Sequence, residues 1–445
     1  MSIVIQGGIV ITANASDEVL SDTSLVIRGT EISDIVSGNK NNAVHSSEVI
    51  NAHGYVIIPG FVQTHVHLCQ TLFRGMADDL ELLDWLQKKI FPYEAAHNEH
   101  SMYCSAILGI AELLRSGTTT ILDMGSVNHQ EEIIRAIGES GMRAFVGKAM
   151  MDINDAYPAL RESTDKSLTS TRDLAERWHN SYEGRVRYAV APRFVLSCSD
   201  TLLHSTREML NSLDGVLFHT HASENTGEVD AVRKRCHMEN IEYLNHLGLL
   251  STKACLAHCI HLTNNEIDIL AQTRTNVTHC PSSNLKLGSG IAKIPLLMDR
   301  NINVALGADG APCNNSLNMF QEMRLASLLQ KPLHGPTAMP AKRVFSMATM
   351  GGAKALGMER EIGSIEVGKK ADLVLLDLRN VWNPIEQENL FSSIVFSASP
   401  ENVDSVMING KWVYRKKEFV SIDVERIMHT SSLELKQLHN RVVFV

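Results

Sequence analysis

The 445-residue chain lacks several features that would assign it to whole classes of protein. No apolar run approaches the roughly 20 residues that a membrane-spanning helix needs. The N-terminus, MSIVIQGGIVITA, has no basic stretch before its apolar residues, unlike a signal peptide. The net charge of −9 provides no electrostatic footprint for nucleic acid or anionic lipid. We therefore expect a cytoplasmic protein that has no nucleic-acid or membrane partner.

The eight cysteines form no C-x-x-C pair and are scattered through apolar segments. This spacing disfavours a cysteine zinc site and is typical of reduced, buried thiols. The chain also lacks the P-C-x-x-C sequence of the zinc deaminases that act on nucleic-acid bases, although H-x-E occurs at His97 and His129. The sequence therefore excludes that class of deaminase.

What the chain does contain is a series of eight short apolar runs, most of them separated by a helical pattern. The runs are GFVQTHVH (60–67), TTTILDM (118–124), RAFVGKAM (143–150), VRYAVAPR (186–193), VLFHTH (216–221), ACLAHC (254–259), NVTHC (276–280) and NVALGAD (303–309). Apolar runs that alternate with helices are typical of a parallel sheet buried on both faces. We predict an α/β fold in which residues 59–361 form a (β/α)8 TIM-type barrel.

The two chain ends have a different pattern. Residues 1–58 and 362–445 contain segments that alternate apolar and polar residues, with turn pairs such as Asn409-Gly410. We predict that they form one small β-sandwich domain, to which residues 1–58 contribute the N-terminal part and residues 362–445 the C-terminal part and a tail.

Histidine or aspartate stands at the end of the first, fifth, sixth, seventh and eighth runs. These residues are His65, His67, His219, His221, His258, His279 and Asp309. Side chains at positions i and i+2 of a strand point the same way, so two histidines of one strand can share an ion. All strands of a barrel end on one rim, so these residues should converge. Three histidines and one carboxylate suit Zn²⁺ or Fe²⁺ with a position left for water, and we predict one divalent ion per chain.

Several motifs make the chain similar to a known family. They are PGFVQTHVHLCQTLFRG (59–75), SGTTTILDM (116–124), HTHASE (219–224), LAHC (256–259), HCPSSNLKLGSG (279–290), LGADGAPCNNSLNMFQEMRLA (306–326) and EIGSIEVGKKADLVLLD (361–377). Over nearly its whole length the sequence resembles the amidohydrolase superfamily. It most resembles the branch of S-adenosylhomocysteine, methylthioadenosine and 5'-deoxyadenosine deaminases. The resemblance implies a metal-dependent deaminase that hydrolyses an adenosine-type nucleoside and releases ammonia.

The same resemblance implies roles for individual residues. The implied metal ligands are His65, His67, His221 and Asp309. Glu224 would carry protons, and His258 would hold the attacking water or the developing oxyanion. Asp309 would also take the proton from water, and His219 would support the ligands. The chemistry agrees with these residue types, because a carboxylate that cycles between acid and base can protonate both the ring nitrogen and the departing ammonia.

Four further residues are candidates for substrate binding. Glu94, in FPYEAAH, matches the glutamate that binds ribose hydroxyls in adenosine-type deaminases. Arg193 departs from the adenosine branch, which often has histidine there, and resembles the Arg-Phe pair with which guanine deaminases contact the base. Lys148 ends the third run, where related enzymes have a cationic group near the ribose or 5' substituent. His279 would orient the substrate or Asp309.

Three alternatives remain open at this point. A guanine deaminase or an s-triazine amino- or chlorohydrolase would use the same metal site. A binuclear cyclic-amide hydrolase would use a carbamylated Lys148 as a bridge and His258 as a further ligand, although the His-x-x-Glu spacing favours one metal. A non-enzymatic scaffold would have lost its ligands, whereas every ligand position is filled here. In each catalytic case we expect a small-molecule, purine-like substrate and a homo-oligomeric protein.

Overall fold

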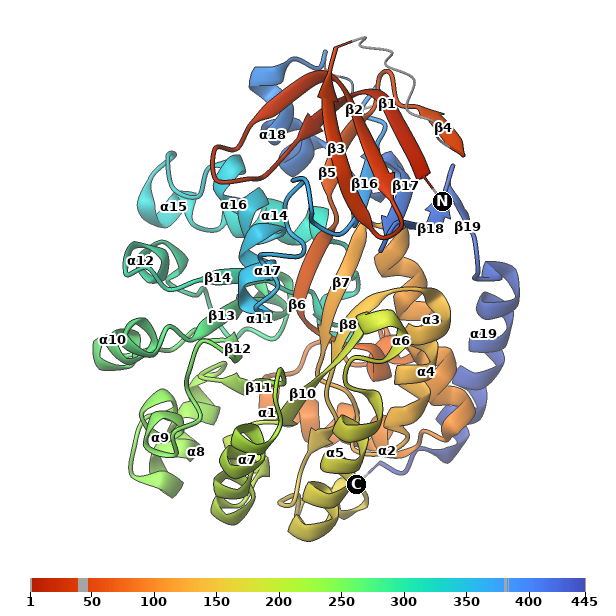
Figure 1. Cartoon of the computed structure of the whole chain (residues 1–445). Helices are drawn as coiled ribbons and strands as arrows, with labels where there is room; N and C mark the ends of the chain where they lie inside the picture. The colour runs from red at the N-terminus through yellow and green to blue at the C-terminus, as the bar shows by residue number, and fades with distance from the viewer. Residues whose placement is uncertain (1, 39–46, 380–381, 383, 445) are drawn as a thin grey trace.

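The computed structural model describes residues 2–38, 47–379, 382 and 384–444. It contains two sheets: a large one surrounded by helices, and a small one formed by segments from both ends of the chain (Figure 1). Within the described residues, no helix combines the length and the apolar character needed to cross a bilayer.

The large sheet is parallel throughout. Its strands are β6 (Phe61–His67), β7 (Thr118–Asp123), β8 (Arg143–Val146), β9 (Ala149–Met150), β10 (Val186–Pro192), β11 (Leu217–Ala222), β12 (Ala254–His258), β13 (Asn276–His279), β14 (Val304–Leu306) and β15 (Asp309–Gly310). Strand β14 pairs with β13 and β15 pairs with β6, while only Gly307 and Ala308 separate β14 from β15. The eighth run therefore brings the sheet back to the first. All eight runs form strands, which confirms the predicted barrel.

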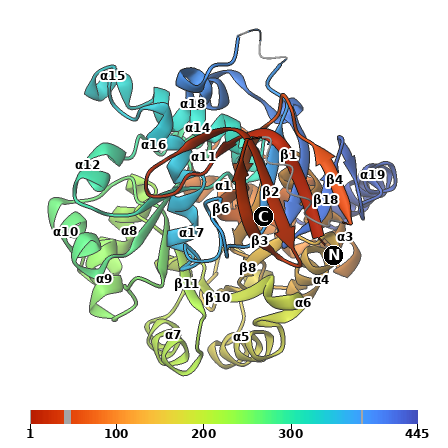
Figure 2. The ribbon, with the colours of Figure 1, turned by 45° about the horizontal axis from the view of Figure 1, so that its top comes forward.

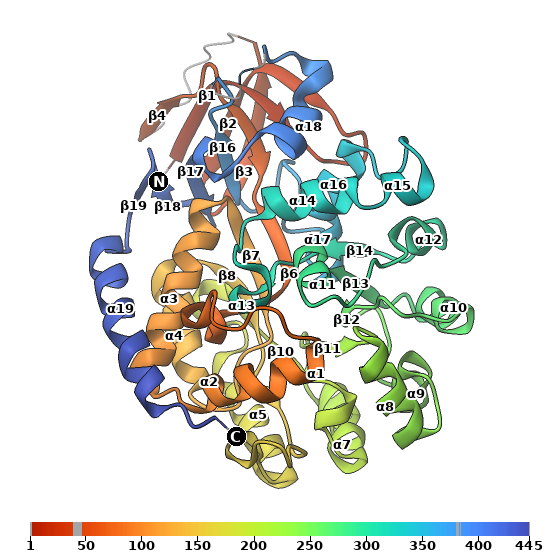
Figure 3. The same cartoon turned by 180° about the vertical axis from the view of Figure 1, so that it is seen from behind.

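Helices surround the barrel strands on the outside (Figures 1 and 3). The longer ones are α3 (Glu99–Arg115), α4 (Gln130–Ser140), α5 (Thr164–Trp178), α7 (Asp200–Ser212), α8 (Thr226–Cys236), α9 (Asn240–His246), α10 (Asn264–Thr273), α14 (Met319–Leu328), α16 (Ala341–Met347) and α19 (Val424–Arg441), which packs against α3. Helix α4 illustrates their pattern, because Ile133, Ile134 and Ile137 are buried while Glu131 is exposed. It ends where Gly141 adopts a left-handed conformation with φ of +83°.

One end of the barrel is filled by an apolar layer. Inward side chains of the strands, among them Val62, Phe145 and Leu217, pack with residues of α17 (Met350–Ala355) and with Met358. Apolar layers of this kind fill the interior of (β/α)8 barrels. The polar strand ends that carry the predicted site are left at the other end.

In the part of the chain that the structure describes, the small sheet has nine strands, and it is confirmed to contain segments from both ends of the chain. Its strands are β1 (Ser2–Ile11), β2 (Val19–Arg28), β3 (Glu31–Ser37), β4 (Glu48–Asn51), β5 (Val56–Pro59), β16 (Leu373–Leu376), β17 (Val403–Ile408), β18 (Lys411–Arg415) and β19 (Glu418–Phe419). The two halves meet where β5 pairs antiparallel with β16. Figure 2 shows this sheet over one end of the barrel. The predicted boundaries after residues 58 and 361 stay predictions.

A buried ion pair joins the small sheet to the barrel. Arg143, the first residue of β8, donates from Nε to Oδ2 of Asp372 at 2.7 Å, and Asp372 also accepts the backbone N–H of Asn409 at 2.7 Å. Because Arg143 begins its strand, the small sheet lies at the N-terminal ends of the barrel strands. The candidate site lies at their C-terminal ends.

Candidate metal centre and active site

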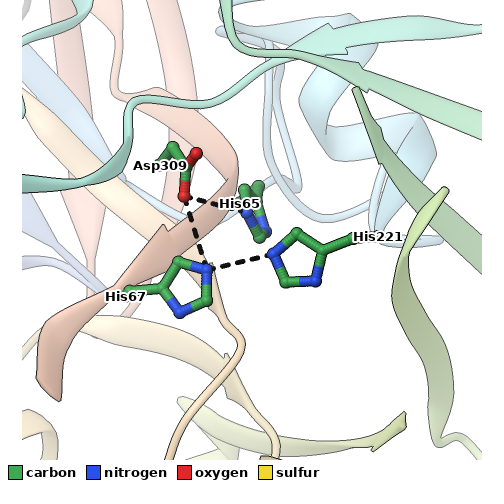
Figure 4. A group of neighbouring side chains, drawn as sticks. All are labelled: His65, His67, His221 and Asp309. Atoms are coloured by element: carbon green, nitrogen blue, oxygen red, sulfur yellow. Dashed lines mark hydrogen bonds and ion pairs between the residues drawn. The ribbon is translucent and has the colours of Figure 1, made fainter. Parts of the chain in front are cut away.

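Four side chains converge at the C-terminal ends of β6 and β11 and at the start of β15. They are His65, His67, His221 and Asp309, and their potential ligand atoms all lie within 4.8 Å of one another (Figure 4). Asp309 Oδ1 is 3.2 Å from His65 Nε2 and 3.4 Å from His67 Nε2. His67 Nε2 is 3.2 Å from His221 Nε2. This set of nitrogen and oxygen donors fits one divalent transition-metal ion.

Hydrogen bonds fix which nitrogen of two of these histidines is free for a metal. His221 Nδ1 lies 2.6 Å from the carbonyl oxygen of Arg193, which can only accept, so Nδ1 carries the proton and Nε2 is left free. His219 donates from Nδ1 to the carbonyl oxygen of Cys255 at 2.8 Å, so its Nε2 accepts from His65 Nδ1 at 2.9 Å. His65 Nε2 is then free as well. His219 therefore holds the ring of His65 through a hydrogen bond without itself belonging to the cluster of four.

Burial favours neutral imidazoles in this cluster. It lowers the pKa of His65, and it lowers the pKa of His67 and His221 well below the ordinary value for histidine. A neutral imidazole is the form that binds a metal ion, since the ligand nitrogen must be unprotonated. The histidines are thus prepared to bind a metal at neutral pH.

Glu224 and His258 lie beside this cluster. His258 Nε2 is 3.4 Å from Glu224 Oε2 and 3.8 Å from Asp309 Oδ2. Asn284 Oδ1 lies 2.8 Å from His258 Nδ1 and holds that ring, while Ser283 donates to Asp309 Oδ2 at 2.6 Å. Burial raises the pKa of Glu224 well above its usual range, and the nearby Asp309 and Glu228 raise it further. Burial thus favours the protonated form of this carboxyl group, which is the form that can give a proton to a substrate.

The backbone is strained where these residues leave their strands. Ser223, His258, Cys259 and Asp309 have φ values of +53°, +73°, +49° and +63°. Residues other than glycine rarely adopt such angles, and each costs on the order of 1–3 kcal/mol. Strain after β11, at the end of β12 and at the start of β15 indicates that the fold holds these side chains in directions that a relaxed chain would not choose.

A cavity opens above the cluster. Its polar lining consists of His67, Gln70, Arg193, His221, Glu224, Glu228, His258 and Asp309. Its apolar lining consists of Leu82, Trp85, Leu86 and Phe194. The first three belong to the segment formed by α1 (Leu82–Trp85) and the π-helix η2 (Leu86–Ile90), which follows β6. One apolar wall opposite polar groups suits a flat aromatic substrate with a few hydrogen-bonding positions.

Glu94 and Arg193 form a buried ion pair next to this cavity. Arg193 donates from Nη1 to Glu94 Oε2 at 2.6 Å and from Nη2 to Glu94 Oε1 at 3.0 Å. Gln70 Nε2 also donates to Glu94 Oε1, at 2.8 Å. Glu94 lies on α2 (Phe91–Ala95), and the Arg193 guanidinium lies over the ring of Phe91 at 5.2 Å. The two predicted substrate contacts are therefore bonded to each other.

The other two predicted substrate contacts, Lys148 and His279, have different surroundings from Glu94 and Arg193. The Lys148 ammonium pairs with Glu162, both residues are buried, and Lys148 is not among the residues lining the cavity. Its nitrogen is thus engaged away from the cluster, which favours a single ion over a lysine-bridged pair. His279 is buried too, and its ring nitrogens have no hydrogen-bond partner within the described residues. Burial, and then His258, lowers its pKa to about 3.

A second group of potential ligands consists of His67, Cys69 and Glu94. Both Glu94 oxygens accept hydrogen bonds from Arg193, and burial raises the pKa of the Cys69 thiol well above its usual range. A thiol must lose its proton to bind a metal, so we assign the ion to the first group. All eight cysteines are free and seven are buried, as the sequence predicted.

Sequence reasoning missed several residues around the site. Ser283 and Asn284 lie within the HCPSSN motif, yet their contacts with Asp309 and His258 did not follow from spacing. The apolar wall and the roles of Gln70 and Glu228 were also missed. The only signal for the wall was its position in the segment directly after the first histidine pair.

Fold and site together define a (β/α)8-barrel protein with a three-histidine, one-aspartate metal cluster at the C-terminal ends of its strands. The chain belongs to the amidohydrolase family, whose model matches residues 56–413. This confirms the resemblance found in the sequence.

Individual proteins of this family are similar over most of the chain. A 5'-deoxyadenosine deaminase of Methanothermobacter thermautotrophicus is 39% identical over 416 residues, which cover 93% of this chain and 94% of the relative. A 5-methylthioadenosine/S-adenosylhomocysteine deaminase of Moorella thermoacetica is 39% identical over 382 residues, covering 85% and 86%. The crystal structure of an adenosine deaminase from Xanthomonas campestris with bound zinc superposes with a TM-score of 0.91 at 30% identity and covers 98% of both chains.

Proposed function

We propose that this protein is a metal-dependent deaminase that hydrolyses 5'-deoxyadenosine, methylthioadenosine or S-adenosylhomocysteine and releases ammonia. The observation that carries the proposal is the position of Glu224, beside His258 and next to a cluster of three histidines and an aspartate. The two relatives that are 39% identical carry the names of deaminases for these nucleosides, which supports the substrate class.

In this proposal His65, His67, His221 and Asp309 hold one Zn²⁺ ion, with Fe²⁺ as the alternative. A bound ion of this kind lowers the pKa of a coordinated water to about 7 and so supplies a nucleophile at neutral pH. Bound zinc in the Xanthomonas campestris structure supports the choice of metal.

The protein's own residues then move the protons. Asp309 accepts a proton from the attacking water, and His258 holds that water and the oxygen that develops charge. Glu224 gives its proton to the ring nitrogen, and the proton that Asp309 took from water passes through Glu224 to the leaving amine. The remaining hydroxyl proton returns to Glu224 as the product carbonyl forms, so the one water consumed replaces both protons. Its raised pKa supports this role, because burial makes the carboxyl group bind its proton more tightly than an exposed glutamate does. The apolar wall of Leu82, Trp85, Leu86 and Phe194 would lie against the flat base.

The sugar is assigned to Glu94, and Arg193 keeps that carboxylate in place. An arginine that already donates twice to Glu94 is poorly placed to read a base, and this favours the nucleoside over the guanine alternative. A carboxylate accepts at about four positions, so the two donors of Arg193 and the one of Gln70 still leave Glu94 a lone pair for a ribose hydroxyl.

The direct test of the function is a substrate panel. Ammonia release should be measured with 5'-deoxyadenosine, S-adenosylhomocysteine, methylthioadenosine, adenosine, guanine and a triazine. We expect the highest kcat/KM for one of the first three compounds. The highest value for guanine or the triazine would contradict the proposed substrate class while leaving the metal site intact.

Replacing Glu94 tests the sugar contact. We expect Glu94→Ala to reduce kcat/KM for the preferred nucleoside. The reduction should correspond to about 1.5–3 kcal/mol of lost transition-state binding, the usual effect of losing a hydrogen bond to a charged group. Deamination of adenine, which has no sugar, is the internal control and should change little. Equal losses with both compounds would mean that Glu94 only supports Arg193.

A further inference from the structure

The carboxyl group of Glu228 lies directly behind Glu224. Glu228 is in the first turn of α8, is only 1% exposed, and lines the cavity. Its Oε2 accepts the backbone N–H of Glu224 at 2.7 Å, and its Oε1 accepts a hydrogen bond from the side chain of Asn240 on α9. The backbone of the proton carrier is therefore bonded to a second buried glutamate.

Glu224 needs such a support because the chain reaches it through a strained turn. Strand β11 ends at Ala222, and Ser223 then has φ of +53°. The carbonyl oxygen of Ser223 accepts the backbone N–H groups of Ile260 at 2.9 Å and His261 at 3.0 Å, which fasten the turn to the segment after β12. Glu228 holds the next residue, Glu224, by accepting its backbone N–H. Without Glu228 the turn would lose this second attachment.

Glu228 also has an ordinary structural explanation, against which this role must be tested. It is the third residue of a helix whose N-cap is Asn225, and a glutamate at this position commonly reaches back to cap the helix. The chain contains a matched case in Glu266 of α10, which is equally buried and accepts the backbone N–H groups of Thr263 at 2.8 Å and Ile241 at 3.0 Å. Glu266 does not line the cavity.

We propose that Glu228 is a positioning residue for Glu224, and that its hydrogen bond to the Glu224 backbone directs the Glu224 carboxyl group toward His258 and the substrate. This inference rests on the proposed deaminase function. The negative charge of Glu228 is also among the causes that raise the pKa of Glu224, after burial and Asp309. Loss of Glu228 should therefore impair the chemical step and leave metal binding intact.

The experiment compares Glu228→Ala with Glu266→Ala, using the substrate that the wild-type protein turns over fastest. We expect Glu228→Ala to keep its metal and its KM while kcat falls by about 10²-fold, the effect of misplacing a reacting group by roughly 1 Å. Glu266→Ala also removes a glutamate that caps a helix, so this variant should be less stable than wild type. Its kcat should stay close to the wild-type value. If both variants keep wild-type kcat, Glu228 is only a capping residue and the inference is wrong.

Two further variants test whether Glu228 acts through Glu224. Glu228→Gln should recover at least tenfold of the lost turnover, because the glutamine oxygen can still accept the Glu224 N–H. The new NH₂ group can in turn donate to the Asn240 amide oxygen, which is unpaired among the described residues, once the Asn240 amide turns over. Adding Glu228→Ala to Glu224→Gln should lower kcat no further, since a residue that acts only through Glu224 has no effect once that carboxylate is gone.

Each remaining outcome contradicts the inference in its own way. A raised KM with normal kcat would make Glu228 a substrate contact, and loss of metal in Glu228→Ala would make it part of the metal centre. Additive losses in the double variant would mean that Glu228 acts independently of Glu224. Failure of the proposed function would be recognised before any variant is made, because the wild-type protein would then release no ammonia from any nucleoside.

Discussion

His221→Ala should lose its metal ion and its activity together. Wild-type protein should contain about one divalent ion per chain, held by three histidines and an aspartate. His221 Nε2 is one of the four proposed ligand atoms, and its Nδ1 is fixed by the carbonyl oxygen of Arg193 at 2.6 Å. Metal affinity should fall by more than the roughly 10–100-fold that follows loss of an outer hydrogen-bond partner. Elemental analysis after dialysis, with turnover measured on the same samples, checks both expectations.

The matched control is His204→Ala, which removes an exposed histidine from helix α7 and should retain both metal and turnover. An inactive His221→Ala protein that still holds one ion would contradict the ligand role. Two ions per wild-type chain, both lost with activity in Lys148→Ala, would instead support a binuclear centre. The ion pair of Lys148 with Glu162 argues against that result.

The barrel could be predicted because each strand leaves a local mark in the sequence. A strand buried on both faces appears as an unbroken apolar run, and eight such runs correspond to β6 through β15. The small sheet leaves weaker marks, because the order of its strands depends on contacts between distant parts of the chain. The pairing of Val56–Pro59 with Leu373–Leu376 is the clearest case. The alternation of apolar and polar residues at both chain ends indicated that they share a domain. No local pattern indicates the register in which their strands pair.

The same distinction applies to the site. The metal cluster follows from position, because residues at the ends of parallel strands meet at one rim of the barrel. The pairing of Arg193 with Glu94 does not, since two segments far apart in the sequence bring these residues together. Lys148 shows a second limit. It lies in the break between β8 and β9, where strand periodicity no longer determines the direction of a side chain, and there it pairs with Glu162.

The strained strand ends connect the fold to the chemistry. All four of these positive-φ residues are, or directly adjoin, residues predicted to act on water or protons: Ser223 precedes Glu224, Cys259 follows His258, and His258 and Asp309 have such angles themselves. Strain of this kind persists only where neighbouring bonds hold it. The hydrogen bonds from Ser283 to Asp309 and between Asn284 and His258 are such bonds. The HCPSSN segment therefore supports the site although it contributes no proposed metal ligand.

Glu224→Gln should separate metal binding from proton transfer. The substitution keeps the shape of the side chain and removes its titrating group, while the four proposed ligands are untouched. We expect folding and metal content to persist. Turnover should fall by at least the roughly 10²–10⁴-fold that one general acid–base residue contributes, and the loss should be larger still if the carboxyl group delivers both protons.

The measurement is kcat on metal-replete Glu224→Gln, with metal content and melting temperature determined for the same preparation. Glu322→Gln is the matched control, because Glu322 is equally buried behind the site and contacts Ser282 and Asn314, yet does not line the cavity. Its kcat should remain within a few-fold of wild type, since it touches no group that exchanges protons with the substrate. A metal-free Glu224→Gln protein would make Glu224 a ligand or its support. Near-normal turnover with metal bound would mean that another residue carries the protons, and His258, at 3.4 Å from Glu224, would be the first to replace.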